Sequence, residues 1–594
     1  MMRIRYIFLL LFIHSVFSLG AQITRVNSQT SLNNAIANIG AGDTILIESG
    51  NSPYSDLAVI LKGNGTSDLP IVIMAETAGN VLLTGNSQVK LGGNYIYFEG
   101  FSFGGNEVPD NLIDEGVIEF RSGTSSSDWC NNCKIKNIKF DAFNQSVAHE
   151  TEVLKWVRVY GQDNEIANCT FINKKGVGNC ITVERNDAIE NRTLIHHNYF
   201  ANRVPIISGS SVLNDQDAIR IGYSGTSLTD ASCRIYDNFF YNWDGEAEII
   251  SNKSNKNKYY NNTFRKCVGT LTLRHGTNCE VYGNFFFGEN ISKSGGVRVI
   301  DSDHKIYNNY FQDLNTGGSK VVGAINLFKG DADFVIDGIL SSYAICEDNL
   351  VANNTIVNCD KGIWIGPNDS GREYEPRNLE IANNIMIDCD EAALIGAAPS
   401  GTNIINGNIK KGGNWWSGFS TAENLETNNN LSSSDGLFER IIQNSEAIGY
   451  AVTLTDFTIS KDILDGNRDT DPDAGAEEFN SNGTFLPYTI NDVGVKVGVI
   501  NSATTGCRDT NSTLKTSFKI YPNPASDQII LEDPGKEIKK VTIYDTEGKL
   551  LKIYDLNNEF EDYKVDLTGL NSGIYILGLK GKLNFSKSLV FIKK

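Results

Sequence analysis

Short alternating runs of apolar and polar residues fill the chain from about residue 60 to residue 500, and helical periodicity is nearly absent there. Gly, Asn and Asp separate the runs, which predicts short strands joined by tight turns. One phrase recurs: an aliphatic or aromatic residue, one or two polar residues, Asn, then two mostly apolar residues. It predicts equivalent positions at Asn168, Asn198, Asn238, Asn262, Asn284, Asn309, Asn354 and Asn384.

The spacing of these asparagines is typical of a solenoid. The shortest steps, from Asn238 to Asn262, Asn284 and Asn309, are 24, 22 and 25 residues, and longer steps indicate inserted loops. Stacked coils would bury one apolar column and let equivalent turn asparagines hydrogen-bond along a ladder. We therefore predict an all-β fold, a right-handed parallel β-helix in which these asparagines are scaffold.

Both ends of the chain depart from this pattern. Two arginines precede an apolar run of about ten residues, and Gly20 and Ala21 follow it, which is typical of a secretory signal peptide over residues 1–21. Residues 28–42 predict a short amphipathic helix that would cap the solenoid. A Ser/Thr/Asn-rich stretch at 501–516 predicts a linker between the solenoid, residues 22–500, and a compact β-sandwich at 517–594.

Composition and charge exclude several classes of protein. The 594 residues are too many for one ordinary compact domain, and 56 Gly with 12 Pro fit a β-rich chain with many turns. The net charge of −19 gives no indication of nucleic-acid binding. No stretch after the signal reaches the roughly 18 apolar residues of a transmembrane helix. A polyanionic partner would need positive charge concentrated locally.

The eleven cysteines are an odd number, so at least one thiol would be free or paired between chains. Cys130 and Cys133 form a single C-x-x-C, which is weak evidence for zinc. Four further cysteines lie in apolar repeat segments, where we expect buried, unreactive side chains: Cys169, Cys267, Cys359 and Cys389.

Carboxylates and strong bases gather between Asn214 and Arg298. Glu246 and Glu248 are two residues apart, so on a strand they would share a face and suit a hard cation such as Ca²⁺. Two solvated surface glutamates are an equally good interpretation. Lys253 and Arg274 are 21 residues apart, close to one coil, which predicts neighbouring positions on one exposed sheet. Alone, either residue would more often be a solvated charge.

The phrases EAEIISNKSNKNKYYNNTF and GTLTLRHG resemble polysaccharide lyase family 6, which contains chondroitinase B and many alginate lyases. The resemblance extends over roughly residues 25–500. It implies that Lys253 is the Brønsted base and Arg274 the proposed acid. It also implies a Ca²⁺ site at Asn214, Glu246 and Glu248, although Asp215 and Asp217 stand beside Asn214 as alternative ligands.

Two further residues are candidates for substrate binding. Arg220 lies in the AIRIG phrase, and His275 follows Arg274 directly. On a strand, His275 would face away from Arg274, so a structural role is the alternative for His275.

The implied reaction removes the C5 proton of a 4-linked uronate and expels the C4 oxygen, leaving an unsaturated sugar. The base must be a neutral amine, and nearby positive charge would lower the pKa of Lys253 toward that form. Cations would also stabilise the enediolate-like transition state. Because a guanidinium hardly ever loses its proton, Arg274 is open to a different role, that of stabilising the leaving oxygen.

Residues 294–311 resemble the alginate-lyase branch, which has an arginine at the position of Arg298. Arg298 is 24 residues past Arg274, so we expect it to extend the basic column and meet the carboxylate of an adjacent uronate. The NLFKG region lacks the glutamate that chondroitinase B uses there. Alginate is the expected substrate. The alternatives are a dermatan-type polymer and a non-catalytic glycan-binding β-helix.

The tail resembles the C-terminal sorting domain of the Bacteroidetes type IX secretion system. The likeness rests on Tyr521-Pro522-Asn523-Pro524, on Tyr544-Asp545 with Gly548, on the phrase 570–575 and on the basic terminus. It implies export through the type IX machinery and release or anchoring at the cell surface. A carbohydrate-binding module is the alternative. We expect a monomer.

Overall fold

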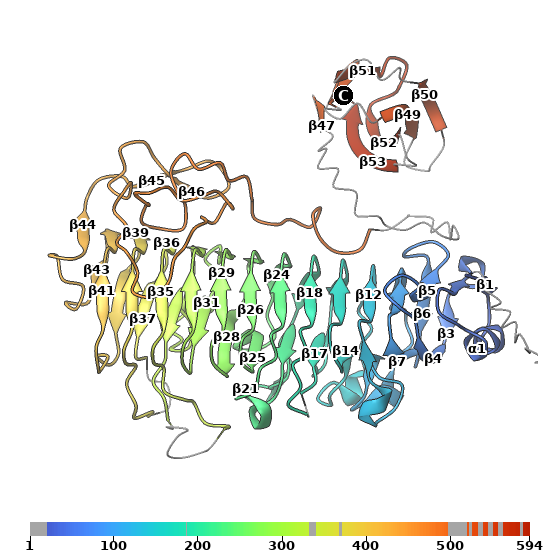
Figure 1. The fold of residues 1–594 in the computed structure, drawn as a ribbon, viewed down its shortest axis with the longest axis horizontal. Helices are drawn as coiled ribbons and strands as arrows, with labels where there is room; N and C mark the ends of the chain where they lie inside the picture. Colours follow the sequence, from blue (N-terminus) through green and yellow to red (C-terminus); the bar gives the residue numbers. More distant parts are fainter. Residues whose placement is uncertain are drawn as a thin grey trace, which may run out of the picture. The chain divides into compact units, whose positions relative to one another are not determined.

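The computed structural model describes residues 21–185, 187–331, 340–367 and 371–496, and within the tail 519–521, 525–532, 538–544, 550–555, 562–581 and 586–593. The predicted signal peptide, apart from Ala21, and the predicted linker lie outside these residues. The chain divides into two compact units, Met1–Gly506 and Cys507–Lys594. In the first unit, three long sheets of fourteen strands each run side by side (Figure 1).

Each coil of the first unit gives one strand to each sheet, and strands of successive coils pair in parallel. The predicted parallel β-helix is therefore present. The first sheet consists of β1 Ile23–Val26, β2 Thr44–Ile47, β5 Ile71–Ala75, β8 Ile96–Glu99, β12 Lys134–Lys136, β15 Glu165–Ala167, β18 Leu194–His196, β23 Arg234–Tyr236, β26 Lys258–Tyr260, β29 Glu280–Tyr282, β32 Lys305–Tyr307, β35 Leu350–Ala352, β38 Glu380–Ala382 and β41 Ile404–Asn406.

The second sheet carries the residues singled out for chemistry. It consists of β4 Ala58–Asn64, β7 Gln88–Asn94, β10 Gly116–Glu119, β11 Cys130–Asn131, β14 Lys155–Val159, β17 Ile181–Val183, β22 Ile219–Ile221, β25 Glu248–Lys253, β28 Gly269–His275, β31 Ser294–Val299, β34 Ile325–Leu327, β37 Lys361–Ile365, β40 Glu391–Ile395 and β43 Asn414–Trp415.

The third sheet closes each coil. It consists of β3 Tyr54–Ser55, β6 Val81–Thr84, β9 Phe101–Phe103, β13 Lys139–Asp141, β16 Thr170–Ile172, β19 Tyr199–Arg203, β24 Phe239–Trp243, β27 Thr263–Arg265, β30 Phe285–Phe287, β33 Tyr310–Gln312, β36 Thr355–Val357, β39 Ile385–Ile387, β42 Ile409–Lys411 and β44 Leu425–Thr427. Two small hairpins join β20 Ile207–Ser208 to β21 Ser211–Val212 and β45 Ser432–Ser434 to β46 Glu439–Ile441.

Helix α1, Gln29–Ala37, precedes the second coil and begins after Ser28, whose side chain accepts a hydrogen bond from the backbone N–H of Ser31. Its one buried residue is Leu32. Within the described ranges, five 3₁₀ turns lie in loops, at η1 Ser49–Asn51, η2 Asp110–Leu112, η3 Ser126–Asp128, η4 Val147–His149 and η5 Ser224–Thr226. Among the described residues, no helix has the length and apolar character that crossing a membrane requires.

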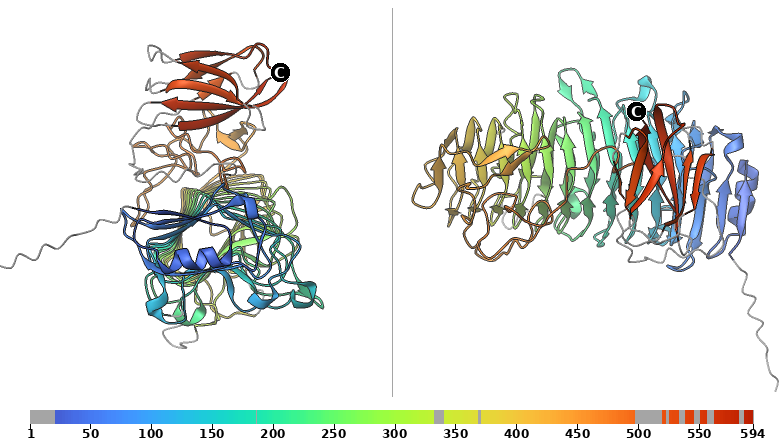
Figure 2. Two further views of the ribbon diagram at one scale, coloured as in Figure 1. Left: turned by 90° about the vertical axis from the view of Figure 1, so that its right-hand side faces the viewer. Right: turned by 90° about the horizontal axis from the view of Figure 1, so that it is seen from above.

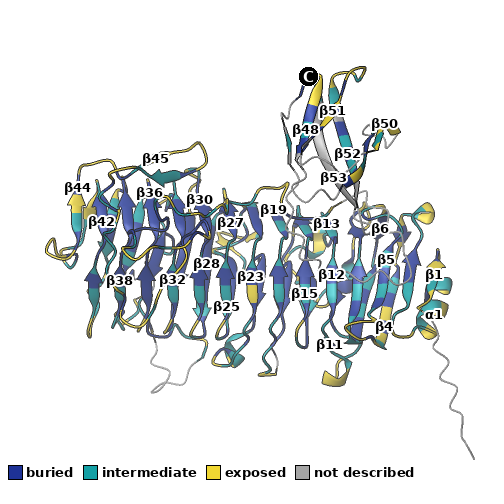
Figure 3. Ribbon diagram, turned by 45° about the horizontal axis from the view of Figure 1, so that its top comes forward, coloured by how far each residue is buried: buried dark blue, intermediate teal, exposed yellow. Residues whose placement is uncertain are grey.

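The main core is an apolar column inside the coils. A separate apolar cluster joins the third sheet to residues of the chain after the last coil, such as Phe438 and Ile463. Buried positions recur along the strands of successive coils (Figure 3). On the third sheet, Phe200, Phe240, Phe264, Phe286 and Phe311 form a continuous stack with ring centroids 4.6 to 4.9 Å apart. Repeated burial of this kind explains why the same apolar phrase returns in every coil. The end-on view shows the sheets enclosing this column (Figure 2).

An asparagine ladder fills one turn of the coils, as the sequence predicted. Each ladder residue donates from its backbone N–H and its amide to the side-chain oxygen of the next asparagine, from Asn198 through Asn238, Asn262, Asn284, Asn309, Asn354, Asn384 and Asn408 to Asn424.

The predicted ladder position of Asn168 is wrong. Cys169 occupies that position, and its backbone N–H donates to the side chain of Asn198 at 2.8 Å. Asn168 precedes it with a φ of 52°, a left-handed conformation that asparagine tolerates well. Asn therefore recurs at this turn for two reasons, the ladder and the backbone conformation just before it.

The cysteines divide into one pair and a set of buried thiols. Cys130 and Cys133 form a disulfide, so zinc does not occupy this C-x-x-C in the structure. The eight other cysteines that the structure describes are buried and free. Burial raises the pKa of the Cys169 thiol to about 12, consistent with the expected unreactive role.

After the last coil, residues 449–496, here called the return segment, run back along the solenoid. Gly475 donates its N–H to the carbonyl of Asn383 at 2.7 Å, and Tyr488 donates to the side chain of Thr263 at 2.8 Å. Lys496 donates its N–H to Asn137 at 3.3 Å. The return segment thus joins coils that are far apart in sequence.

The second unit has two antiparallel sheets. One consists of β47 Lys519–Tyr521, β48 Gln528–Glu532 and β51 Asp562–Asp566, and the other of β50 Leu550–Asp555, β49 Ile538–Tyr544, β52 Gly573–Gly581 and β53 Ser586–Lys593. Residues of both sheets share one apolar cluster, which includes Leu531, Val541 and Leu577.

Candidate active site

Lys253 is the last residue of β25, on the second sheet between β22 and β28. The four middle residues of this strand are buried, and Lys253 at its end is half-buried. Glu248 begins the same strand and is also half-buried. One strand therefore supplies both an amine and a carboxylate to the outer surface.

A β-bulge brings Arg274 beside Lys253. Asn252 pairs with Leu273, but Lys253 pairs with His275, so Arg274 is an extra residue on β28 at this point. Bulges of this kind re-aim side chains and are common beside active sites. The predicted neighbours thus meet through a register shift rather than through simple stacking.

Arg298 lies in a different row from the one predicted. It pairs with Thr272 on β28, two residues before Arg274, and Thr272 pairs with Ser251. Arg220 on β22 pairs with the same Ser251. Arg298 and Arg220 therefore share a row that does not contain Arg274, because a spacing near one coil cannot specify register to two residues. In this row the Arg298 guanidinium forms an ion pair with Glu248.

The second carboxylate, Glu246, lies in the bend before β25 and not on the strand itself. Its side chain accepts a hydrogen bond from the backbone N–H of Gln216 at 2.8 Å and is hydrogen-bonded to Asp217. Asp217 also accepts from Asn179 at 2.8 Å and from Arg220 at 3.3 Å. Burial and the adjacent Asp217 raise the pKa of Glu246 to about 10.

The carboxyls of this cluster differ in charge. Burial also raises the pKa of Asp217, so Asp217 and Glu246 are a pair that shares a proton or needs a cation. Burial would raise the pKa of Glu248 too, but Arg298 and the Ser251 hydroxyl outweigh burial and hold that pKa below its ordinary value. Glu248 is therefore the ionised carboxylate beside Lys253.

The predicted calcium ligands converge only in part. In the part of the chain that the structure describes, no group of three or more His, Cys, Asp or Glu side chains is arranged to hold a metal ion. Asn214 is exposed on the loop before β22, and Asp215 beside it pairs with Arg220. Asp217 and Glu246 form the closest carboxyl pair, which is the arrangement that a hard cation would stabilise. Glu248 is directed to Arg298 instead.

Lys253 has an environment that disfavours its charged form. Burial is the largest cause and lowers the pKa of Lys253, and the positive charges of Arg220 and Arg274 lower it further. The negative charges of Glu248 and Asp217 raise it in part. The net effect is a pKa below the ordinary value of lysine.

Two residues beside Arg274 were missed by the sequence reasoning. The Arg274 guanidinium carbon lies 3.9 Å from the ring centre of Tyr343, and that of Arg372 lies 3.6 Å from the same ring. Both come from loops with no periodic pattern, so no sequence signal pointed to them. His275 is only 1% exposed, and burial lowers its pKa to about 2, so this imidazole is neutral and buried.

A second missed cluster lies on the same sheet upstream of Lys253, centred on β14, three strands from β25. The Lys155 amine donates to Glu184 at 3.0 Å and to the Tyr223 hydroxyl at 2.7 Å, and Arg158 donates to Glu184 at 2.7 Å. Arg158 pairs with Thr182, and Thr182 with Arg220. Positive charge therefore extends along this sheet beyond Arg220.

The sequence was compared with models of known families. The model described as chondroitinase B matches residues 26–368, which is more than half of the chain and includes every candidate site residue. The chain belongs to the chondroitinase B family. Family membership agrees with the long parallel β-helix, the fold it shares with the family 6 structures. No curated protein matches the chain.

Solved structures agree with this placement. AlyGC, a PL6 family alginate lyase, is 25% identical with a TM-score of 0.66 over 80% of this chain and 59% of AlyGC. This chondroitinase B family member thus spans 59% of the length of AlyGC. A mannuronic acid specific family 6 lyase from human gut microbiota is 25% identical with a TM-score of 0.54, over 66% of this chain and 86% of that one. Pedsa3628 from Pseudopedobacter saltans, a PL6 family polysaccharide lyase, is 25% identical with a TM-score of 0.53, over 66% and 92%.

Residues 519–593 match the secretion system C-terminal sorting domain. This chondroitinase B family member is therefore a type IX secretion substrate, directed to the cell surface or the exterior. The predicted resemblances of the solenoid and of the tail are both confirmed.

Proposed function

We propose that the chain is an alginate lyase that cleaves 4-linked uronate chains by β-elimination, with Lys253 as the base. The observation that carries the proposal is the position of Lys253, half-buried on the outer face, opposite the Arg274 bulge and between Arg220 and Arg298. An amine with a lowered pKa in a cationic surface can accept the C5 proton of a bound uronate.

The arginines have separate tasks in this proposal. Arg220 and Arg298 attract the substrate carboxylate and stabilise the charge that develops when the C5 proton leaves. Arg274 stabilises the C4 oxygen as the bond breaks. Burial lowers the pKa of Arg274, but the group remains a cation at neutral pH, so we assign the proton for the leaving group to water. For His275, which is neutral and buried, we propose the structural role in place of substrate binding.

Calcium is the proposed cofactor, with Glu246, Glu248 and Asn214 as ligands and Asp217 as the alternative to Asn214. The buried Asp217–Glu246 pair supports a cation at this position, because the pair otherwise requires a shared proton. When bound, Ca²⁺ would neutralise the substrate carboxylate and so acidify the C5 proton. Binding would compete with Arg298 for Glu248.

Alginate is favoured over a dermatan-type polymer for two reasons. Arg298 is present in the row of Arg220, and alginate carries a carboxylate on every sugar. AlyGC and the gut lyase, both similar to this chain, are described as acting on alginate or mannuronic acid.

We further propose that residues 1–21 are a signal peptide, 22–500 the lyase domain, 501–516 a linker and 517–594 a β-sandwich sorting domain, with α1 capping the solenoid of a monomeric enzyme.

The Lys253→Ala variant tests the proposal. Alginate and dermatan sulfate are incubated with the full chain, and the ultraviolet absorbance of the unsaturated product is followed. We expect alginate turnover to fall by about 10²- to 10⁴-fold in the variant, as for loss of a general base. Lys256→Ala, an exposed lysine paired with Asp230, is the matched control. Unchanged turnover in Lys253→Ala would falsify the assignment of Lys253 as the base. Unsaturated product from dermatan sulfate but not from alginate would mean that the substrate is a dermatan-type polymer.

A further inference from the structure

Arg274 differs from the two other arginines of the second-sheet site in how it is held. Arg220 pairs with two aspartates, and Arg298 pairs with Glu248. Among the described residues, the Arg274 guanidinium has neither an ion pair nor a hydrogen bond to a protein group, although its Nη1 is buried. A long side chain without such partners keeps its rotamer freedom unless another contact removes it.

The strand does not supply that contact either. Arg274 is the extra residue of the bulge in β28: its neighbours Leu273 and His275 have strand partners, and Arg274 has none on β25 or β31. A bulge re-aims a side chain but does not fix its outer end. The direction of the guanidinium therefore depends on what packs against it.

The ring of Tyr343 packs against the Arg274 guanidinium. The guanidinium carbon of Arg274 lies 3.9 Å from the ring centre, and that of Arg372 lies 3.6 Å from it. Two guanidinium groups this close to one ring centre would collide on the same face, so the ring lies between them. An aromatic face attracts a cation at such distances, and the flat guanidinium stacks on it. The N–H groups of Arg274 lie in the guanidinium plane, so stacking leaves them available as donors.

Asp331 holds Tyr343 in turn. The backbone N–H of Tyr343 donates to the Asp331 carboxylate, and the backbone N–H of Asp331 donates to the carbonyl of Tyr343 at 2.9 Å. The same carboxylate lies 3.6 Å from Nε of Arg372. Phe328 packs edge-on against the Tyr343 ring, with ring centroids 6.3 Å apart. The ring is thus fixed through its backbone, its edge and the face opposite Arg274.

We propose that Tyr343 is a positioning residue, whose ring holds the Arg274 guanidinium at the leaving C4 oxygen without using any of the N–H donors that bind this oxygen. A carboxylate partner would also fix the guanidinium, but it would occupy donors and offset the positive charge. A ring does neither. This inference rests on the proposed function, in which Arg274 stabilises the C4 oxygen as the bond breaks.

The first test replaces the ring in the full chain, with an alginate tetrasaccharide as substrate. Tyr343→Leu should lower kcat by up to about 10²-fold with little change in KM, because a misplaced donor is lost mainly from the transition state. Tyr343→Phe keeps the ring and should recover most of the parent kcat. Equal losses in the two variants would assign the effect to the hydroxyl and overturn the positioning role.

A second test asks whether the effect acts through the arginine. In the Arg274→Ala background, Tyr343→Leu should cause no further loss of kcat, because the contact it removes is already gone. Losses that multiply in the double variant would mean that Tyr343 acts independently of Arg274, and the proposal would be wrong.

Urea unfolding separates this inference from the proposed function, because it does not depend on activity. The losses of urea midpoint in Tyr343→Leu and Arg274→Ala should be non-additive in the double variant, as expected for contacting residues. If the parent chain cleaves no uronate polymer, the proposed function fails, and non-additive midpoints still assign Tyr343 as the residue that holds Arg274. Additive midpoints would contradict the stack.

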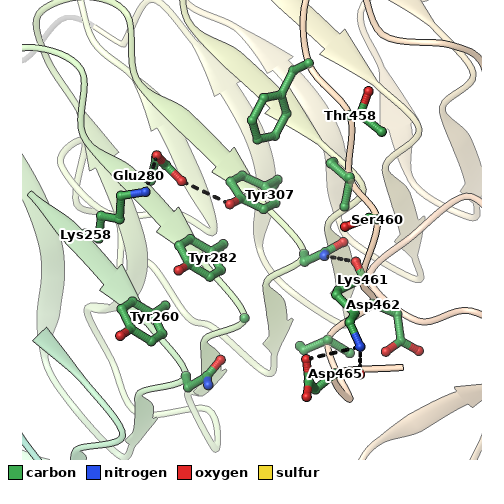
Figure 4. A pocket seen from close by; sticks show the side chains of 16 residues that line it. Lys258, Tyr260, Glu280, Tyr282, Tyr307, Thr458, Ser460, Lys461, Asp462 and Asp465 are labelled. Carbon is green, nitrogen blue, oxygen red and sulfur yellow. Dashed lines mark hydrogen bonds and ion pairs between the residues drawn. The ribbon is translucent and has the colours of Figure 1, made fainter. Parts of the chain in front are cut away.

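Tyr282→Leu is the matched control, because it removes a stacked ring from a sheet that carries neither Lys253 nor Arg274. Figure 4 shows Tyr282 between Tyr260 and Tyr307 on the first sheet. With Tyr236 these rings form a stack whose centroids are 4.8, 5.0 and 4.9 Å apart in order. Tyr282→Leu should leave kcat unchanged. A fall in kcat equal to that of Tyr343→Leu would mean that losing any stacked ring disturbs the solenoid, and it would overturn the specific role of Tyr343.

Discussion

The asparagine ladder and the second-sheet site are built from the same coils in opposite ways. In the ladder, every asparagine from Asn198 to Asn408 donates the same two hydrogen bonds to the asparagine of the next coil, and Asn424 is the last acceptor. Around Lys253 each coil carries a different residue from the coil next to it: Arg220, Ser251, Thr272 and Arg298 occupy one row, and the register shifts at Arg274. Repetition marks what holds coils together, and departures from it mark chemistry.

The outer face of the first sheet lies between these two cases. Its tyrosines repeat like the ladder, but they point to solvent, where repetition is not needed for burial.

The largest effect on turnover is expected for a substitution of Glu246, in the second-sheet site. Glu246→Gln removes one carboxylate of the pair with Asp217, so calcium affinity and turnover at low calcium should fall about 10- to 100-fold or more. The measurement is product absorbance during calcium titration after chelation, together with the rise in melting temperature on adding calcium.

Glu289→Gln, which breaks ion pairs with Arg265 and Lys266 on the third sheet, is the control for loss of a glutamate. A parent enzyme that keeps full turnover and an unchanged melting temperature in chelator would exclude the metal. The basic row would then neutralise the substrate carboxylate by itself.

A smaller effect is expected on the pH profile of Arg220→Gln. Lys253 acts as the neutral amine, so turnover falls as pH drops through its pKa. Arg220 lowers the pKa of Lys253, so its removal raises that pKa. Its removal also leaves Asp217 without its ion pair, and the negative charge of Asp217 raises the pKa of Lys253 further. The acidic limb of kcat against pH should therefore move to higher pH. Because Arg220 also stabilises the developing charge, the alkaline plateau should lie below that of the parent.

Arg265→Gln on the third sheet is the control, and it should leave the acidic limb of the pH profile unchanged. An acidic limb that stays fixed, or moves to lower pH, in Arg220→Gln would mean that a group other than Lys253 titrates.

The features that follow from repetition could be predicted from the sequence, and those that interrupt it could not. The spacing of the repeated phrase predicted the β-helix, the asparagine ladder and the position of Lys253 and Arg274 on one sheet. It misassigned Asn168, because Asn also suits the left-handed position one residue earlier. It could not give the bulge at Arg274, since one added residue leaves a spacing within the range of coil lengths. Tyr343 and Arg372 come from loops, where no period constrains the chain.

The smallest effect on turnover, and the clearest effect on stability, is expected at Asn384 in the ladder. Its buried amide donates to Asn408 at 2.9 Å and to the carbonyl of Val351 at 2.9 Å, and its oxygen accepts from Asn354. Asn384→Ala leaves several of these groups unpaired in the interior, which costs about 1–3 kcal/mol for each. We expect the free energy of unfolding to fall by about 2–4 kcal/mol in urea titrations.

Below the unfolding transition, the tetrasaccharide turnover of Asn384→Ala should match that of the parent, because its coil lies several strands from β25. Asn430→Ala, at an exposed loop position, should change neither quantity. A folded Asn384→Ala protein with lowered turnover would break the comparison, since a scaffold position would then be setting the geometry of the site. Unchanged stability would mean that the ladder bonds are replaced by water and do not hold the coils together.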